Sequence, residues 1–235
     1  MNHHGNEPYR VTGKSFTAAA VNMASKAGEY MKSKLGAAEH VQTKSNAHDL
    51  VTEVDKGTET LIRNLIRTYF PDHAVLGEEG VGPGTEASAR AAAELRNEEF
   101  VWVIDPVDGT TNFVHGVPFY SVSIALAYRG EVIVGVVYDP SRDELFVAEK
   151  GKGAYLRGRR ISVSREERLA DSLLATGFPT DRERSQPRAL AQLSAVAPKV
   201  RNVRNMGSAA LHLAYVAAGR LSGFWEENLN AWDTA

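Results

Sequence analysis

The chain has 235 residues, of which 43% are hydrophobic and 24% charged, and its net charge of −2 gives no general electrostatic case for nucleic-acid binding. Because there is no cysteine, disulfides, thiolate nucleophiles and cysteine-based metal sites are excluded, so any metal would be bound by oxygen or imidazole. No apolar run is long enough to cross a bilayer and the N-terminus lacks the apolar core of a signal peptide, so we expect a cytoplasmic protein.

Two amphipathic helices are predicted in the first third of the chain. Apolar residues recur at spacings of three and four over residues 12–35 and again over residues 54–70. Asp55 lies at the start of the second helix and is open to two interpretations, as a helix cap or as a site residue. Glu59 and Arg63 are four positions apart, which is typical of a solvated ion pair on a helix surface.

Two short apolar stretches are each followed directly by acidic residues. Residues 74–76 precede the sequence GEEG at residues 77–80, and residues 100–104 precede Asp105. Paired glutamates most often lie on a protein surface. Here the flanking glycines allow the backbone to approach a ligand closely, and the acids follow a predicted strand. We therefore interpret both turns as candidate parts of one site.

The motif DPVDGTTNF at residues 105–113 contains two carboxylates, Asp105 and Asp108, three positions apart. It follows an apolar strand, so Asp105 is expected where the strand ends and the chain turns. The Gly-Thr-Thr run that follows is suited to a helix start, whose free N–H groups bind phosphate. Carboxylate oxygens suit a divalent cation. The motif therefore predicts a site for a cation and a phosphate together.

The middle of the chain is rich in predicted strands, and the last third alternates strands with helices. A hairpin is predicted around Arg129-Gly130-Glu131 within an antiparallel sheet, whereas the later alternation predicts a second, largely parallel sheet. The predicted elements are strands 120–128, 132–138, 145–148 and 154–156, then strand 173–176, helix 185–197, strand 200–203, helix 209–218 and strand 223–225. We therefore predict one α/β domain over residues 1–235, with an antiparallel-sheet half at about 1–165 and an α/β half at about 166–235.

Several acidic residues follow predicted strands and could meet at one edge of the sheets. Without cations, converging carboxylates would repel one another and raise one another's pKa, so we expect divalent metal between them. Two such ions can activate a water and stabilise the leaving oxygen in phosphoryl transfer. The acids concerned are Glu78, Asp105, Asp108, Glu226 and Asp233.

With these motifs together, the chain resembles the inositol monophosphatase family, the magnesium-dependent and lithium-sensitive phosphomonoesterases related to fructose-1,6-bisphosphatase. Residues 105–113 match the family signature DPxDGTxNF, and Trp232-Asp233 match its C-terminal signature. Residues 77–79 and 49–55 match two further blocks, in the same order. The resemblance implies a layered α/β/α/β/α sandwich, usually dimeric, with two or three Mg²⁺ per site and Mn²⁺ as a substitute.

The resemblance also implies roles for individual residues. For one metal the implied ligands are Glu78, Asp105 and the carbonyl of Val107. For the second they are Asp105, Asp108 and Asp233, and a third, weaker Mg²⁺ would use Glu78. The implied catalytic residues are Thr110, Asp55 and Glu79. The implied substrate-binding residues are Asp108, Gly109, Thr110, Gly207, Ser208, Ala209 and Glu226. Lys44 corresponds to a lysine of the entrance loop.

Family members continue past the equivalent of Trp232-Asp233 with a helix and further strands. This sequence has two residues after Asp233. We therefore expect the C-terminal elements of the sandwich to be missing, and three interpretations stay open: a fragment of a longer protein, a chain whose second metal site is weakened, or an inactive truncated form.

The leading hypothesis is hydrolysis of a small polyol or sugar monophosphate, with inositol 1-phosphate as the first candidate. Fructose-1,6-bisphosphate, NADP and histidinol phosphate are alternative substrates within the same family. A relative that binds RNA or the transcription machinery is an alternative of a different class, for which Arg201, Arg204 and Arg220 could form a basic face. We expect these arginines to be solvated, and neither nucleic-acid nor membrane binding.

Overall fold

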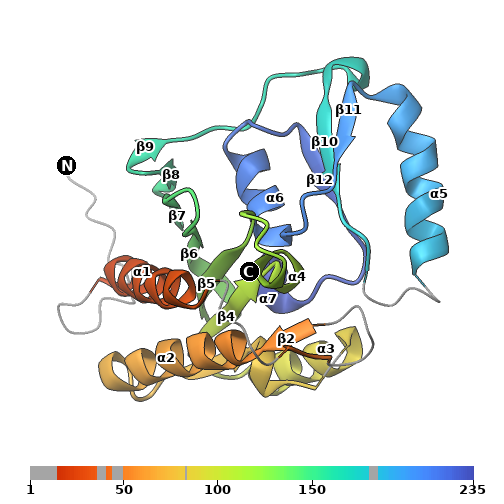
Figure 1. Ribbon diagram of the computed structural model, residues 1–235. Helices are drawn as coiled ribbons and strands as arrows, with labels where there is room; N and C mark the ends of the chain where they lie inside the picture. Colours follow the sequence, from red (N-terminus) through yellow and green to blue (C-terminus); the bar gives the residue numbers. More distant parts are fainter. Residues whose placement is uncertain (1–14, 36–40, 44–49, 83, 180–184) are drawn as a thin grey trace, which may run out of the picture.

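The computed structural model describes residues 15–35, 41–43, 50–82, 84–179 and 185–235 (Figure 1). Lys44 of the predicted entrance loop lies outside these residues. Within them, a larger mixed sheet and a smaller parallel sheet are layered with helices, so the predicted α/β fold is confirmed. None of the helices that the structure describes is both long and apolar enough to cross a lipid bilayer.

The larger sheet has seven strands among the described residues, and their spatial order follows the sequence. The first two strands are parallel, and all later neighbours are antiparallel. The predicted hairpin turns at Arg129 and Gly130, both with positive φ, as the tightest hairpin turns require. The strands are β3 (Ala74–Gly77), β4 (Phe100–Asp108), β5 (Ser121–Tyr128), β6 (Glu131–Asp139), β7 (Glu144–Glu149), β8 (Gly153–Leu156) and β9 (Arg159–Arg160).

Both faces of the larger sheet are covered, which explains why β4 is apolar at successive positions. Trp102 and Ile104 face the core formed with α1 (Phe16–Lys34) and α2 (Glu53–Tyr69). Val101 and Val103 face the opposite side, where they pack with Trp232 of α7 (Ala231–Thr234) and near α3 (Thr85–Glu94). A strand buried on both faces loses the alternating pattern of a half-exposed strand.

The smaller sheet confirms the predicted parallel arrangement of the last third. Strand β10 (Leu173–Thr176) lies between β11 (Asn202–Arg204) and β12 (Gly223–Trp225), parallel to both. Figure 1 shows α6 (Ala209–Ala217) between the two sheets and α5 (Gln186–Val196) on the outer side of the smaller one. Shorter elements complete the fold: η1 (Glu78–Gly80), α4 (Thr110–Val114), η2 (Leu169–Asp171) and η3 (Ala197–Lys199).

One sequence prediction about local structure is wrong, and one pair of strands was not predicted. Strand β4 does not end before Asp105 but continues through Asp108, with an irregularity in its pairing to β5 between these two residues. Such a bulge accommodates Pro106, which has no N–H to donate to the ladder. In addition, the polar stretch before α2 contains β2 (Leu50–Thr52), which pairs antiparallel with β1 (Val41–Thr43).

Asn112, from the central motif, joins the two halves of the fold. Its side-chain amide donates to the carbonyl of Phe119, at 2.7 Å, and to the carbonyl of Met206, at 2.6 Å. Gly207 packs directly against this amide, because a Cβ there would lie 2.8 Å from the Asn112 nitrogen. The loop before β5 and the loop before α6 are therefore fixed to the start of α4 by one side chain.

We expect Asn112→Ala to lower the free energy of unfolding by about 1–3 kcal/mol, because two partly buried carbonyls lose their donor. Guanidinium titration followed by circular dichroism measures this value. Asn202→Ala is the matched control, since Asn202 is exposed and its side chain accepts the adjacent backbone N–H of Val203, at 2.8 Å. An unchanged unfolding free energy for Asn112→Ala would contradict the bridging role.

Candidate active site

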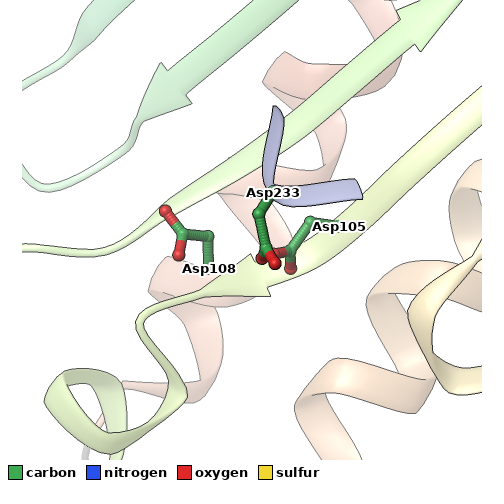
Figure 2. Close-up of side chains that lie close together, drawn as sticks. All are labelled: Asp105, Asp108 and Asp233. Carbon is green, nitrogen blue, oxygen red and sulfur yellow. The ribbon is translucent and has the colours of Figure 1, made fainter. Parts of the chain in front are cut away.

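Three aspartates form an acidic cluster between β4 and α7 (Figure 2). Asp105, Asp108 and Asp233 each offer a carboxylate oxygen, and these oxygens lie within 4.8 Å of one another. Asp105 and Asp108 are buried and Asp233 is half-buried. All the donors are oxygen atoms, which are the ligands that a hard divalent cation prefers. A bound cation would also offset the repulsion among the three carboxylates. The residues present therefore fit a divalent metal site.

The position of Asp233 depends on its helix. The neighbouring Trp232 is buried against the outer face of the larger sheet, with Val101 and Val103 in the same apolar cluster. The Asp233 carboxylate accepts the N–H of Asn230, at 2.6 Å, which fixes the first turn of α7. Packing of the tryptophan and this cap together direct the carboxylate to Asp105.

Asp108 connects the acidic cluster to the start of α6. Its carboxylate accepts hydrogen bonds from the hydroxyl of Ser208, from the N–H of Ala209 at 3.1 Å and from the N–H of Ala210 at 2.9 Å. The Ser121 hydroxyl on β5 contacts the same carboxylate at 3.3 Å. Burial raises the pKa of Asp108 above its ordinary value, and these hydrogen bonds oppose that shift. Two of the predicted substrate-side residues, Ser208 and Ala209, therefore hold Asp108.

Thr110 and Asp55 form the second part of the site. The Thr110 hydroxyl lies 2.8 Å from Asp55 Oδ1 and 2.9 Å from the carbonyl oxygen of Val107. The other Asp55 oxygen accepts the N–H of Thr52, at 2.8 Å, in a capping box at the start of α2. The interpretation of Asp55 as a helix cap is therefore confirmed for one carboxylate oxygen, while the other oxygen binds Thr110.

Glu78 and Glu79 lie beside the cluster, at the end of the strand next to β4. Gly77 pairs with Ile104 in the parallel register of β3 and β4, so Glu78 follows β3 at the level of Asp105. Both glutamates are half-buried in η1, and the three-aspartate cluster does not include Glu78. The carboxyl ends of parallel strands meet at one edge of a sheet, so the order of β3 and β4 places Glu78 next to Asp105.

Glycine is required at position 109 for two reasons. Its φ is +95°, in the region that favours glycine, and a Cβ there would lie 2.9 Å from the carbonyl oxygen of Gly207 and 3.1 Å from that of Phe119. Gly207 itself has a φ of +85°. Two predicted binding residues, Gly109 and Gly207, therefore meet backbone to backbone at the site.

Glu226 lies directly after β12, at the carboxyl end of the smaller sheet. Burial raises its pKa to about 7, with further contributions from the charges of Asp108 and Asp233. Its carboxyl group packs directly against Gly177, so a Cβ at position 177 would displace it. The acid is thus near the cluster, as the sequence pattern predicted, but comes from the other sheet.

Three residues that the sequence analysis did not assign to the site also contact it. Ser121 binds Asp108, Asn112 binds the loop before α6, and Glu59 binds the backbone of Glu79. Asn112 belongs to the central motif, but its partner Met206 is 94 positions away and leaves no local pattern. Glu59 lies one helical turn after Asp55, so it shares the buried face of α2 with a predicted catalytic residue.

Comparisons with known proteins agree with this geometry. The family model described as "Inositol monophosphatase family" matches residues 13–235. "Nus factor SuhB" of Pasteurella multocida is 42% identical over 217 residues, or 92% of this chain and 78% of that protein. "Inositol-1-monophosphatase" of Rhizobium meliloti is 40% identical over 212 residues, covering 89% of this chain and 76% of that protein.

Solved structures show the same relationship. The extragenic suppressor protein suhB of Bartonella henselae matches with a TM-score of 0.82 and 40% identity, over 93% of this chain and 80% of that one. The inositol monophosphatase of Anabaena matches with a TM-score of 0.77 and 37% identity, over 93% of this chain and 76% of that one. The family model, the identity to these relatives and the shared fold show that this chain belongs to the inositol monophosphatase family.

Proposed function

We propose that the protein is a Mg²⁺-dependent phosphomonoesterase that hydrolyses a small polyol or sugar monophosphate, with inositol 1-phosphate as the first candidate. The observation that supports this most directly is the cluster of Asp105, Asp108 and Asp233 beside the Thr110–Asp55 pair. Carboxylates for cations and a hydroxyl–carboxylate pair for water are the groups that phosphate-ester hydrolysis requires.

The cations would be held by oxygen atoms on both sides of the cluster. Glu78, Asp105 and the Val107 carbonyl would bind one, and Asp105, Asp108 and Asp233 the second; a third, weaker ion would depend on Glu78. When bound, such cations neutralise phosphoryl charge and make water a better nucleophile. Mn²⁺ offers the same preference for oxygen ligands and would substitute.

The Thr110–Asp55 pair would orient the attacking water. A hydroxyl that donates its proton to Asp55 presents its lone pairs to a water, and so directs the water's own lone pair at phosphorus. The Val107 carbonyl, at 2.9 Å, competes for the same hydroxyl proton and keeps the side chain in place. Glu79 would act as a further acid around this water.

Substrate would lie between the two sheets. The backbone N–H groups of Gly109 and Thr110 would bind the phosphate, with Asp108 at its edge. Gly207, Ser208 and Ala209, at the start of α6, would form the wall next to the sugar or polyol. Glu226, directly after β12, would hydrogen-bond a ring hydroxyl.

We expect the protein to release phosphate from inositol 1-phosphate when Mg²⁺ is present and not in its absence, because the acidic cluster cannot bind an anion without cations. Phosphate release measured against Mg²⁺ concentration tests this. Fructose-1,6-bisphosphate, NADP and histidinol phosphate in the same assay separate the alternative substrates. We also expect inhibition by Li⁺, on the family resemblance.

Absence of phosphate release from every compound at all Mg²⁺ concentrations would contradict the proposal. A preference for another of these phosphates would keep the reaction and replace the substrate. We propose a homodimer as well, from the family resemblance alone.

The name of the Pasteurella relative refers to a Nus factor, which describes that protein. In this chain, two of the three arginines proposed for a basic face are bound to carboxylates. Arg220 makes two hydrogen bonds of 2.6 Å to Glu144, and Arg201 lies 3.6 Å from Asp171. Because these charges are paired, we do not propose nucleic-acid binding for this surface.

A further inference from the structure

Glu59 is a buried carboxylate that the reaction outlined above does not use. It is 4% exposed, and its partner Arg63 keeps about a quarter of its side chain in solvent. The prediction of a solvated ion pair is therefore wrong for the acid. Burying a carboxylate costs free energy unless hydrogen bonds and an opposite charge compensate, so its contacts indicate what it does.

The contacts of Glu59 lead to the turn that contains Glu78 and Glu79. One carboxylate oxygen accepts the N–H of Glu79, at 2.8 Å, and the other accepts Nε of Arg63, at 2.7 Å. The N-cap of η1 is Gly77, which has no side chain to cap the turn. The carboxylate of Glu59 thus supplies, from α2, the acceptor that a capping residue would normally provide.

The two glycines of the turn make room for this pair. A Cβ on Gly77 would lie 2.6 to 2.7 Å from its three nearest atoms, all in the carboxyl group of Glu59. A Cβ on Gly80 would lie 3.0 Å from a terminal nitrogen of Arg63. Gly77 has φ −127° and ψ 149°, which any residue adopts, so the glycine is needed for space and not for backbone conformation.

The same helix face also holds Asp55. Asp55 and Glu59 are four positions apart and both buried, so they lie one turn apart on α2. Asp55 binds Thr110 on one side, and Glu59 binds the turn after β3 on the other. A single rigid helix therefore sets the distance between the Thr110 side of the site and the Glu78–Glu79 side.

We propose that Glu59 is a positioning residue, which fixes the Gly77–Gly80 turn so that Glu78 and Glu79 face the three-aspartate cluster. This inference rests on the proposed function, since Glu78 is proposed there as a cation ligand. Residues that hydrogen-bond to the surroundings of a metal ligand commonly change metal affinity by 10- to 100-fold when removed. Glu59 acts on Glu78 through the backbone of the adjacent residue.

The test compares Mg²⁺ binding by calorimetry in the wild type, Glu59→Ala, Gly77→Ala and the double variant. We expect each single variant to raise the Mg²⁺ Kd by about 10-fold or more, and Mg²⁺ excess to restore much of the activity. Gly77→Ala displaces the carboxylate without removing any charge. In the double variant the Glu59 carboxyl group is absent, so the alanine at position 77 displaces nothing. The increases in Mg²⁺ Kd of the two single variants should therefore not add.

Glu144→Ala is the matched control, because Glu144 is also a partly buried partner of an arginine but lies on β7, away from the acidic cluster. Its Mg²⁺ Kd should equal that of the wild type. Thermal unfolding in EDTA establishes that each variant is folded. If Glu59→Ala does not fold, the Mg²⁺ Kd of Gly77→Ala alone tests the proposal.

An unchanged Mg²⁺ Kd in a folded Glu59→Ala or Gly77→Ala protein, or additive effects in the double variant, would overturn the positioning role. Because the measurement is of binding, it does not depend on turnover. A wild type that binds Mg²⁺ but releases no phosphate would remove the proposed function, while the comparison of Kd values would still decide the role of Glu59.

Discussion

Replacing Asp105 by asparagine should abolish phosphate release and leave the fold intact. Asp105 is the proposed ligand common to two cations, so its loss should lower kcat by about 10³-fold, or about 4 kcal/mol of transition-state stabilisation. The neutral side chain has the same size, and it relieves repulsion with Asp108 and Asp233 when no cation is bound. Stability in EDTA should therefore be equal or higher, whereas stabilisation by Mg²⁺ should be lost.

Thermal unfolding with Mg²⁺ and with EDTA, together with phosphate release, tests each part of this expectation. Asp171→Asn is a suitable control, because Asp171 forms a surface ion pair with the largely exposed Arg168. Its activity and unfolding should match the wild type within about 0.5 kcal/mol. An Asp105→Asn protein that keeps its activity would remove Asp105 from the site and the proposed reaction with it.

The second large effect is expected at Thr110. Thr110→Ala removes the hydroxyl that lies 2.8 Å from Asp55, so the attacking water loses its proposed orienting group. We expect kcat to fall by about 10²-fold, in the range typical of proton-transfer groups, with little change in the Mg²⁺ Kd. Thr110→Ser keeps the hydroxyl and should retain most of the activity.

Steady-state kinetics at saturating Mg²⁺ separates this effect from loss of metal. Thr111→Ala is the neighbouring control, since Thr111 is exposed on the same short helix. If Thr110→Ser were as impaired as Thr110→Ala, the hydroxyl would not be the reason, and a packing role for the threonine methyl would replace the proposed one.

One part of the candidate site, the closeness of Glu78 and Asp105 along neighbouring strands, could be expected from the sequence. Parallel strands end at a common edge, so Glu78 after β3 and Asp105 in β4 were expected near each other, and the register of Gly77 with Ile104 places them so. The exact end of β4 could not be predicted. Pro106 normally indicates a strand end, and only the pairing with β5 shows that a bulge accommodates it.

The role of Glu59 could not be predicted, because the pattern in sequence is the same for exposed and buried pairs. Glu59 and Arg63 have the spacing of a solvated pair. The pair differs from a solvated one because Gly77 and Gly80, from the turn after β3, pack against it. Such tertiary contacts leave no local periodicity. The paired glycines of the turn were noted for backbone approach to a ligand, whereas here they admit two side chains of α2.

The hydrogen bonds of Asp108 have a consequence for how the protein forms. Its partners Ser208, Ala209 and Ala210 lie 100 to 102 positions later in the chain, whereas most strands of the larger sheet pair with their neighbours in sequence. Closing so long a loop costs chain entropy that hairpin contacts do not, so we expect these bonds to form late in folding. On this expectation the hairpins of the larger sheet precede the link between Asp108 and α6, which amide hydrogen exchange during refolding would measure.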